Sequence, residues 1–375
     1  MRKGIIIGIA VCILLAAGLS FFMIFAINND GINVVSVKEH GLELVNTQQI
    51  SLENITSIEI EYTSDDVVFY ASDTDELILK EYKTYTPEED ELSKLSTNGN
   101  ELSIRSGRHN NRIFSIGNHY SRNDIYLPAK YAEELAVTTS SGNITSDLSF
   151  KLSQFTVNCH SGDVTLNEVY ANSIKMASSS GNITIQKAEG ERKISSHSGD
   201  IKVYSGKGES TFEASSGNIT IEKAVGNLTA DANSGNIKIM DSEGEKEVET
   251  SSGNITIENS TGLIKATASS GEVEVTALKG DGRISTKSGN INFELKEVTG
   301  DIELEASSGN ATLIVPDTIT CNFNAEASSG NIKTFFDDQL SINKNRDYAS
   351  GTIGDNPSIT IQMNTMSGNI RVEDH

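Results

Sequence analysis

Ser180-Gly181-Asn182-Ile183-Thr184-Ile185 is the stretch that decides the fold, because it returns at a fixed distance along the chain. The same six letters stand at residues 216–221 and again at residues 252–257. Between Gly181 and Gly289, successive Ser-Gly glycines are evenly spaced, with a period of about 18 residues. A fixed period of this length is the sequence signature of a solenoid. The 13 Ser-Gly glycines that align with this repeat are Gly142, Gly162, Gly181, Gly199, Gly217, Gly235, Gly253, Gly271, Gly289, Gly309, Gly330, Gly351 and Gly368.

The residues around each glycine predict strands. The second residue after the glycine is almost always Ile or Val, and the residue after it is mostly polar, as in Thr184, Lys202 and Thr220. Alternation with a period of two is typical of a β-strand with one buried face. A second inward position lies five residues before the glycine, as in Ile194 and Phe212. Each repeat unit therefore supplies two short strands.

The strands of successive units are expected to pair with one another, since no segment with helical periodicity separates them. The chain has no proline between Pro128 and Pro316, which fits strands that need every backbone N–H. The sequence predicts an all-β protein, built as a single-stack β-solenoid of about 13 coils with two short strands per coil.

The glycines are expected at the corners of the coils, where they supply a positive φ or a close backbone approach. Asn follows most of them, and stacked Asn side chains can hydrogen-bond along the column. Gly190 and Gly208 are examples of a second set that falls half a period later. The glycines assigned as structural corners are Gly142, Gly181, Gly199, Gly217, Gly235, Gly253, Gly271 and Gly289.

Composition excludes some classes of function. The 375 residues include 30 Lys and Arg against 52 Asp and Glu, with a formal net charge of -22. This acidic excess argues against nucleic-acid binding, which depends on clustered cations. Three cysteines cannot form a disulfide framework. We expect Cys159 and Cys321 to be free thiols, because many coils separate them.

The amino-terminal residues predict a location. Residues 4–27 carry no charge and are long enough to cross a bilayer as a helix, while Arg2 and Lys3 precede them. The positive-inside rule then puts residues 1–3 in the cytoplasm and residues 28–375 outside, anchored in the cell membrane by a single pass. A cleaved signal peptide is the alternative, but its apolar region is normally shorter.

Two regions follow the predicted transmembrane helix. Residues 28–131 are interpreted as a linker and a β-rich N-terminal cap, because solenoids must cover their open edges. Residues 132–375 are interpreted as the Ser-Gly-Asn repeat solenoid, with irregular C-terminal coils because residues 335–356 depart from the pattern.

Residues 125–128, Ile-Tyr-Leu-Pro, are followed by Leu-Ala-Val-Thr-Thr-Ser-Ser-Gly-Asn-Ile at residues 135–144 and then by the repeats. This arrangement resembles the bacterial putative-adhesin family, which includes the LiaG-type membrane-anchored proteins of Gram-positive envelope-stress operons. The resemblance covers roughly residues 50–375. It implies an extracytoplasmic β-solenoid that senses the envelope or attaches to a surface, and it supplies no catalytic residues to carry over.

Four arginines form the candidate binding site. The segment from residue 103 to residue 123 contains no acidic residue, so its arginines could bind an anionic wall polymer or lipid head groups. The alternative is a solvated loop whose charges pair with acidic neighbours. The arginines are Arg105, Arg108, Arg112 and Arg122.

No catalytic, cofactor or metal site is predicted. His160 and His197 each precede a Ser-Gly pair, but two coils separate them, too far to share a zinc ion. We therefore expect a non-catalytic scaffold whose partner is a cell-envelope component, either a wall polymer or a membrane protein. A β-helical polysaccharide-acting enzyme is the alternative, and it would need converging carboxylates.

Overall fold

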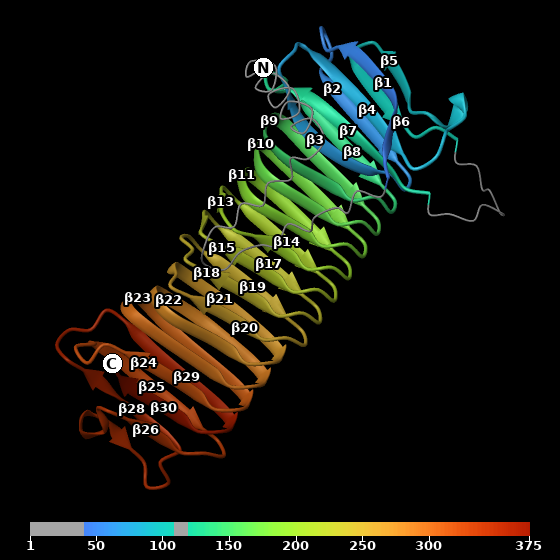
Figure 1. Cartoon of the computed structure of the whole chain (residues 1–375). Coiled ribbons are helices and arrows are strands. Elements are labelled where there is room, and N and C mark those ends of the chain that lie inside the picture. Colours follow the sequence, from blue (N-terminus) through green and yellow to red (C-terminus); the bar gives the residue numbers. More distant parts are fainter. Residues whose placement is uncertain (1–40, 109–118) are drawn as a thin grey trace, which may run out of the picture. The chain divides into compact units, whose positions relative to one another are not determined.

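The computed structural model describes residues 41–108 and 119–375, and residues 43–375 form one compact unit. In this unit two rows of strands face each other across a continuous core (Figure 1). Row B strands come before each Ser-Gly corner, and row A strands follow it. Strand β9 (Ile144–Cys159) runs through a half-period corner and contributes to both rows. It pairs with β3 (Asp66–Ser72) at its start and with β8 (Glu134–Thr139) at its end.

The predicted all-β solenoid is confirmed over the described residues, which contain no α-helix. Parallel pairs join each strand to the equivalent strand of the neighbouring coil, as in Ile201↔Ile219 and Phe212↔Ala230. The strands of this repetitive part are β10 (Val164–Ser178), β11 (Ile183–Ser196), β12 (Ile201–Val203), β13 (Gly206–Lys207), β14 (Ser210–Ala214), β15 (Ile219–Glu222), β16 (Ala224–Val225), β17 (Leu228–Ala232), β18 (Ile237–Met240), β19 (Lys246–Thr250), β20 (Ile255–Glu258), β21 (Thr261–Ser270), β22 (Val273–Ser288), β23 (Ile291–Ser308) and β24 (Ala311–Val315).

The core is a stack of aliphatic layers. Ile183, Ile194 and Ile219 are fully buried, and Phe212 is 1% exposed. These are the two inward columns that the period of two predicts. Their burial removes apolar surface from water in every coil, which is the main stabilising contribution of each repeat.

The N-terminal end is closed by antiparallel strands. We call residues 43–128 the N-terminal cap. In row A, β7 pairs with β3 on one side and antiparallel with β4 on the other, and β4 pairs with β1. In row B, β2 lies between β8 and β6, and β5 covers β6. The elements of the cap are β1 (Glu43–Ser51), β2 (Ser57–Tyr62), β3 (Asp66–Ser72), β4 (Glu76–Lys83), the 3-10 turn η1 (Glu89–Glu91), β5 (Lys94–Asn98), β6 (Glu101–Arg105) and β7 (Ser121–Pro128). β8 (Glu134–Thr139) is the first strand after the cap.

The last two coils are stacked in the reverse of their chain order. β29 lies between β23 and β25, and β30 lies between β24 and β26. The final coil therefore sits one layer inside the coil that precedes it in the sequence. The elements are β25 (Cys321–Ala327), β26 (Ile332–Thr334), the 3-10 turn η2 (Asp337–Gln339), β27 (Ser341–Ile342), β28 (Tyr348–Ile353), β29 (Thr360–Ser367) and β30 (Ile370–Asp374).

The prediction of about 13 coils is wrong, since the solenoid has about 10 turns. Gly142 to Gly309 stack in chain order, whereas Gly368 stacks on Gly309 and Gly330 stacks on Gly368. Gly351 is not a corner, because it lies within β28 opposite Phe323 in an antiparallel pair. Ser-Gly is compatible with extended backbone as well as with a corner, so pairing with β25 decided its conformation.

The predicted transmembrane helix over residues 4–27 and the single-pass cell-membrane location are not supported. In the described part of the chain, no helix is long and apolar enough to span a bilayer. Its helical elements are two short 3-10 turns, whereas a span needs about 20 residues. Residues 1–27 themselves lie outside the described residues.

Candidate functional site

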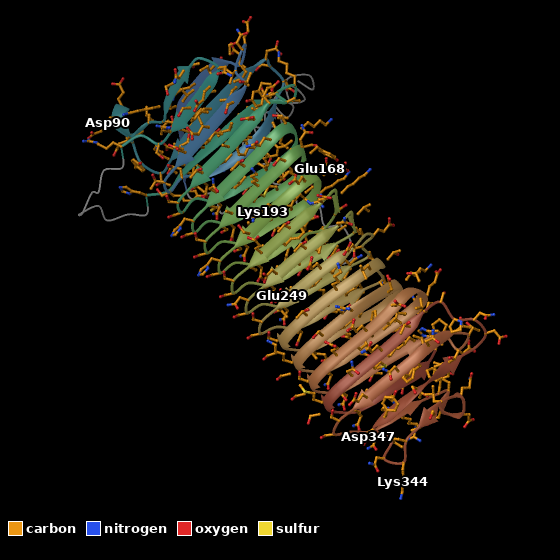
Figure 2. All side chains as sticks on the ribbon, turned by 180° about the vertical axis from the view of Figure 1, so that it is seen from behind. Asp90, Glu168, Lys193, Glu249, Lys344 and Asp347 are labelled. Carbon is orange, nitrogen blue, oxygen red and sulfur yellow. The ribbon has the colours of Figure 1, made fainter. Side chains whose placement is uncertain are left out.

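The structure pairs two of the predicted binding arginines with carboxylates. Arg105 Nη2 lies 3.1 Å from Glu59 Oε2, across the β6–β2 pair. Arg108 Nε lies 2.9 Å from Oδ2 of Asp90, a residue of the η1 turn that Figure 2 labels. Both arginine side chains are more than half exposed. Arg112 lies outside the described residues. In the described part of this segment, the arginine charges thus pair with acidic neighbours.

Arg122 belongs to a different surface, the outward face of row A in the cap. It lies on β7, between β3 and β4. Its Nη2 donates a hydrogen bond to Asp124 Oδ2 at 3.2 Å, and its Nε lies 2.9 Å from Asp124 Oδ1. Its guanidinium carbon lies 4.9 Å from the centre of the Tyr82 ring. Arg122 is therefore held by an ion pair along its own strand and by a cation–π contact to the next strand.

Aromatic side chains surround this ion pair. Strand register places Tyr126 beside Tyr70 on β3, and their rings stack with centres 5.1 Å apart. The Nζ of Lys80, on β4, lies 4.5 Å from the centre of the Tyr126 ring. The register also places Lys80 opposite Asp124. We call this surface the tyrosine–arginine face, and it consists of Tyr70, Lys80, Tyr82, Arg122, Asp124 and Tyr126.

Burial raises the pKa of four acidic groups on this face, Asp124 and the three tyrosines. It raises the pKa of Asp124, while the charge and the hydrogen bond of Arg122 act in the opposite direction. Burial, followed by the charge of Asp124, raises the pKa of Tyr82 and of Tyr126. The same two causes raise the pKa of Tyr70. Clusters of perturbed titratable groups are found preferentially at functional sites, which makes this face the candidate site.

Sequence reasoning found Arg122 but missed the tyrosines. A usable signal was present, because Arg122, Asp124 and Tyr126 alternate along one strand and therefore share one face. The partners Lys80 and Tyr82 show the same alternation on a strand much earlier in the chain. Only the pairing of β4 with β7 reveals that the two patterns adjoin.

The histidines do not form a metal site. His160 Nδ1 lies 3.0 Å from Ser179 Oγ in the next coil. In residues 41–108 and 119–375, no three His, Cys, Asp or Glu side chains are placed to hold a metal ion. His197 lines a surface hollow of about 440 Å³ together with Glu213 and Asp231, which neighbour each other on β14 and β17. Cys159 and Cys321 are buried free thiols.

The Ser-Gly corners are closely stacked. A Cβ on Gly217 would lie 1.9 Å from the carbonyl oxygen of Gly199, far inside contact distance. The predicted hydrogen bonding of the Asn column is confirmed: Asn236 N donates to Asn218 Oδ1 at 3.0 Å, and Asn218 Nδ2 donates to Asp200 Oδ1 at 3.1 Å. The other assigned corners, at Gly142, Gly181, Gly199, Gly235, Gly253, Gly271 and Gly289, show the same approach to a carbonyl of the preceding coil.

The chain matches the model of one protein family. The model of the Toastrack DUF4097 family matches residues 55–259 and 211–373, and the chain belongs to this family. This finding supports the predicted resemblance to putative adhesins at the level of the family. No curated protein matches the chain.

Two solved structures are similar to the chain. A putative cell adhesion protein from Clostridium sporogenes ATCC 15579 is 10% identical, with a TM-score of 0.24, over 88% of this chain and 98% of that one. A putative lipid binding protein from Parabacteroides distasonis ATCC 8503 is 21% identical, with a TM-score of 0.37, over 66% of this chain and 95% of that one.

Proposed function

We propose that this member of the Toastrack DUF4097 family is a non-catalytic, adhesin-like scaffold that binds a cell-envelope component through its tyrosine–arginine face. The observation that carries the proposal is the gathering of Tyr70, Tyr82, Tyr126 and Arg122 on one outward face. Tyrosine and arginine are the residue types enriched in interfaces and in their energetic hot spots. The outward positions of the solenoid carry Thr, Lys and Glu instead, as in Thr220, Lys238 and Glu274.

The side chains of this face are held in place before any partner binds. The Tyr70–Tyr126 stack and the contacts of Arg122 fix their rotamers across three strands. Binding then costs less conformational entropy than it would for free surface side chains. Lys80 and Arg122 also offset the charge of Asp124 in a chain whose net charge is -22. An anionic wall polymer is repelled less there than elsewhere on the surface, so we propose such a polymer as the ligand.

A sedimentation assay with purified cell walls tests this function. We expect the full chain to co-sediment with the walls, and Tyr82→Ala and Arg122→Gln to weaken binding about tenfold or more. Arg283→Gln is the matched control, because Arg283 also pairs with an acidic neighbour, Glu303, but lies on the solenoid. Equal binding by all four proteins would refute the role of the face.

The arginine segment is a second route to the same ligand class. Arg105 and Arg108 are more exposed than Arg122 and exchange their acidic partners more easily with a polymer. Arg105→Ala combined with Arg108→Ala should then abolish a binding that falls with added salt. Loss of binding in this variant, with normal binding by Tyr82→Ala, would show that the ligand binds at Arg105 and Arg108 rather than at the tyrosine–arginine face.

The alternative of a polysaccharide-acting enzyme has one candidate location. Glu213 and Asp231 are in register on adjacent strands, so their Cα atoms are about 4.8 Å apart, and both line the same hollow as His197. Paired carboxylates at short range are what glycoside hydrolysis requires. We expect no new reducing ends when the chain is incubated with wall polysaccharides. Release that disappears in Glu213→Gln would establish the enzyme and overturn the scaffold.

Within the family, the LiaG-type assignment is a further proposal. Its support is the Ser-Gly-Asn-Ile repeat and the Ile-Tyr-Leu-Pro segment at residues 125–128. Recovery of envelope-stress proteins after crosslinking in cells would support this assignment.

A further inference from the structure

Strand β26 ends row A at the C-terminal end of the stack. β30 is the strand that pairs with it. Ile370 N donates to Asn331 O and Phe335 N donates to Val372 O, so the odd-numbered residues of this segment face β30. In a parallel pair, alternate residues direct their backbone groups to opposite sides. Ile332 and Thr334 therefore direct theirs away from the stack, along an edge where a further strand could pair.

Two residues, Arg346 and Asp337, occupy this edge in place of a strand. The Arg346 carbonyl accepts a hydrogen bond from Ile332 N at 2.7 Å. The guanidinium of Arg346 donates to Ile332 O from Nε and Nη2, at 3.1 and 3.0 Å. Asp337 Oδ1 accepts hydrogen bonds from Thr334 N and Thr334 Oγ1, both at 2.8 Å. An ion pair joins Arg346 to Asp337. We call Arg346, with its carbonyl and its guanidinium, and the Asp337 side chain the Asp337–Arg346 clamp.

The turn that carries the clamp holds a strained position. Arg346 has φ +58, in the left-handed region that side chains other than glycine rarely adopt. Figure 2 labels Lys344 and Asp347 in this turn, which projects from the end of the stack. Asp347 N and Tyr348 N donate to Asn343 Oδ1, which fixes the turn. A conformation of this kind persists only where its contacts outweigh the strain.

At the other ends of the two rows, a further antiparallel strand covers the last strand of the stack. At the same end of row B, β28 pairs antiparallel with β25, and β27 pairs with β28. At the N-terminal end, β4 and β1 extend row A, and β5 extends row B. In the described residues, β26 thus differs from β7, β6 and β25 in being covered by Arg346 and Asp337 rather than by an antiparallel strand. Phe335, which follows β26 directly, and Tyr348, two residues after Arg346, are 36% and 43% exposed.

We propose that the Asp337–Arg346 clamp is an end-stop, which keeps β26 of a second copy of this chain from pairing with this edge. An uncovered edge strand flanked by exposed aromatic side chains is a template for strand addition. The same edge is present on every copy, so two copies can pair β26 with β26 antiparallel about a two-fold axis. Such pairing gives a closed dimer, in which Phe335 of each copy packs against the other. This role of the clamp does not depend on the ligand proposed for the tyrosine–arginine face.

Mass measurement in solution tests the end-stop on the full chain. We expect Arg346→Ala and Asp337→Ala to double the mass by light scattering as concentration rises. The unmodified chain and Arg371→Ala should show no such increase. Arg371 is the matched control because it pairs with Glu373 on β30, outside the clamp. Clamp variants that keep the native circular dichroism spectrum and an unchanged mass would overturn the proposal.

A second substitution locates the association. Ile332→Pro removes the outward N–H of β26, and edge positions tolerate proline. Added to Arg346→Ala, it should restore the original mass. A dimer that persists would show that association uses another surface and would refute the inference.

Hydrogen exchange on the unmodified chain covers the case in which clamp variants do not fold. The amides of Ile332 and Thr334 should exchange slowly, because the clamp accepts both hydrogens. Rapid exchange at these two amides, with slow exchange at Lys333, would show that the clamp does not form and would refute the end-stop.

Discussion

The two corners of each coil use glycine for different physical reasons. At the Ser-Gly corner, exemplified by Gly217, the constraint is space, because the carbonyl oxygen of Gly199 lies where a Cβ would be. At the half-period corner, Gly226 has φ +123, a conformation that side chains other than glycine rarely adopt. Both corners are closely stacked, because a Cβ on Gly226 would also lie 2.6 Å from Gly208 O, but the half-period corner adds a conformational demand.

The corners also satisfy their polar groups differently. Outside the Ser-Gly corner, an exposed ladder of Asn and Asp side chains links one coil to the next. Inside the half-period corner, buried cationic side chains hydrogen-bond to the backbone carbonyls in two coils. Arg192, which is 2% exposed, donates to the carbonyls of Ala188 and Lys207 at 2.7 Å, and Lys246 donates to Gly244 O at 2.7 Å. The Asn and Asp ladder recurs in successive coils, whereas each buried cation makes contacts that are specific to one position in the stack.

Gly217→Val tests the spatial demand and should have the largest effect. The Cβ would be forced against the backbone of the preceding coil, which cannot move without breaking its own pairing. We expect the free energy of unfolding to fall by more than about 4 kcal/mol, measured by chemical denaturation. Ser216→Val is the control, because Ser216 is exposed beside the same corner. Equal stability of both variants would contradict the close stacking.

Lys246→Met tests the buried cation through pH. Burial lowers the pKa of Lys246 to about 8, whereas the unfolded chain retains the ordinary value near 10.5. The unfolded state therefore binds the proton more tightly, and this contribution to stability rises as pH increases from about 8 to about 10.5. Relative to Lys246→Met, the unmodified chain should gain about 3 kcal/mol over this window. A constant difference between the two proteins across the window would show that Lys246 titrates normally.

Gly226→Ala tests the conformational demand of the half-period corner. A Cβ there meets a φ of +123 and lies 2.6 Å from Gly208 O. We expect a loss of about 2 kcal/mol, since strained backbone positions cost about 1–3 kcal/mol each. The neighbouring exposed Val225→Ala should change little. A loss as large as that of Gly217→Val would mean that the two corners are equivalent after all.

Asn218→Ala tests the outer ladder and should have the smallest effect. It removes one acceptor for Asn236 N and one donor to Asp200 Oδ1, in a solvated position. A net loss of about 1 kcal/mol is expected, because water replaces part of each hydrogen bond. Asn158→Ala, exposed but outside the ladder, is the control. If both variants are equally stable, the ladder contributes no net stability.

Much of the fold was predictable, and much of the candidate site was not. The alternation around Ile183 and the inward position of Phe212 follow from a local period of two, which any single repeat displays. Arg122 stood out by its charge, but its connection to Tyr82 depends on an antiparallel pair between β4 and β7, which lie far apart in the chain. The clamp at Asp337 and Arg346 had no repeat pattern to reveal it.

The sequence by itself determined the coil: its two strands, its glycine corners and its buried faces. These properties depend on backbone sterics and on burial within a single repeat. Only the tertiary structure decided the order of the coils at the ends, where β29 and β30 enter one layer inside β25 and β26. Every coil presents nearly the same aliphatic surface to its neighbours, so local sequence does not specify which coil lies beside which. The contacts that close each end make that choice.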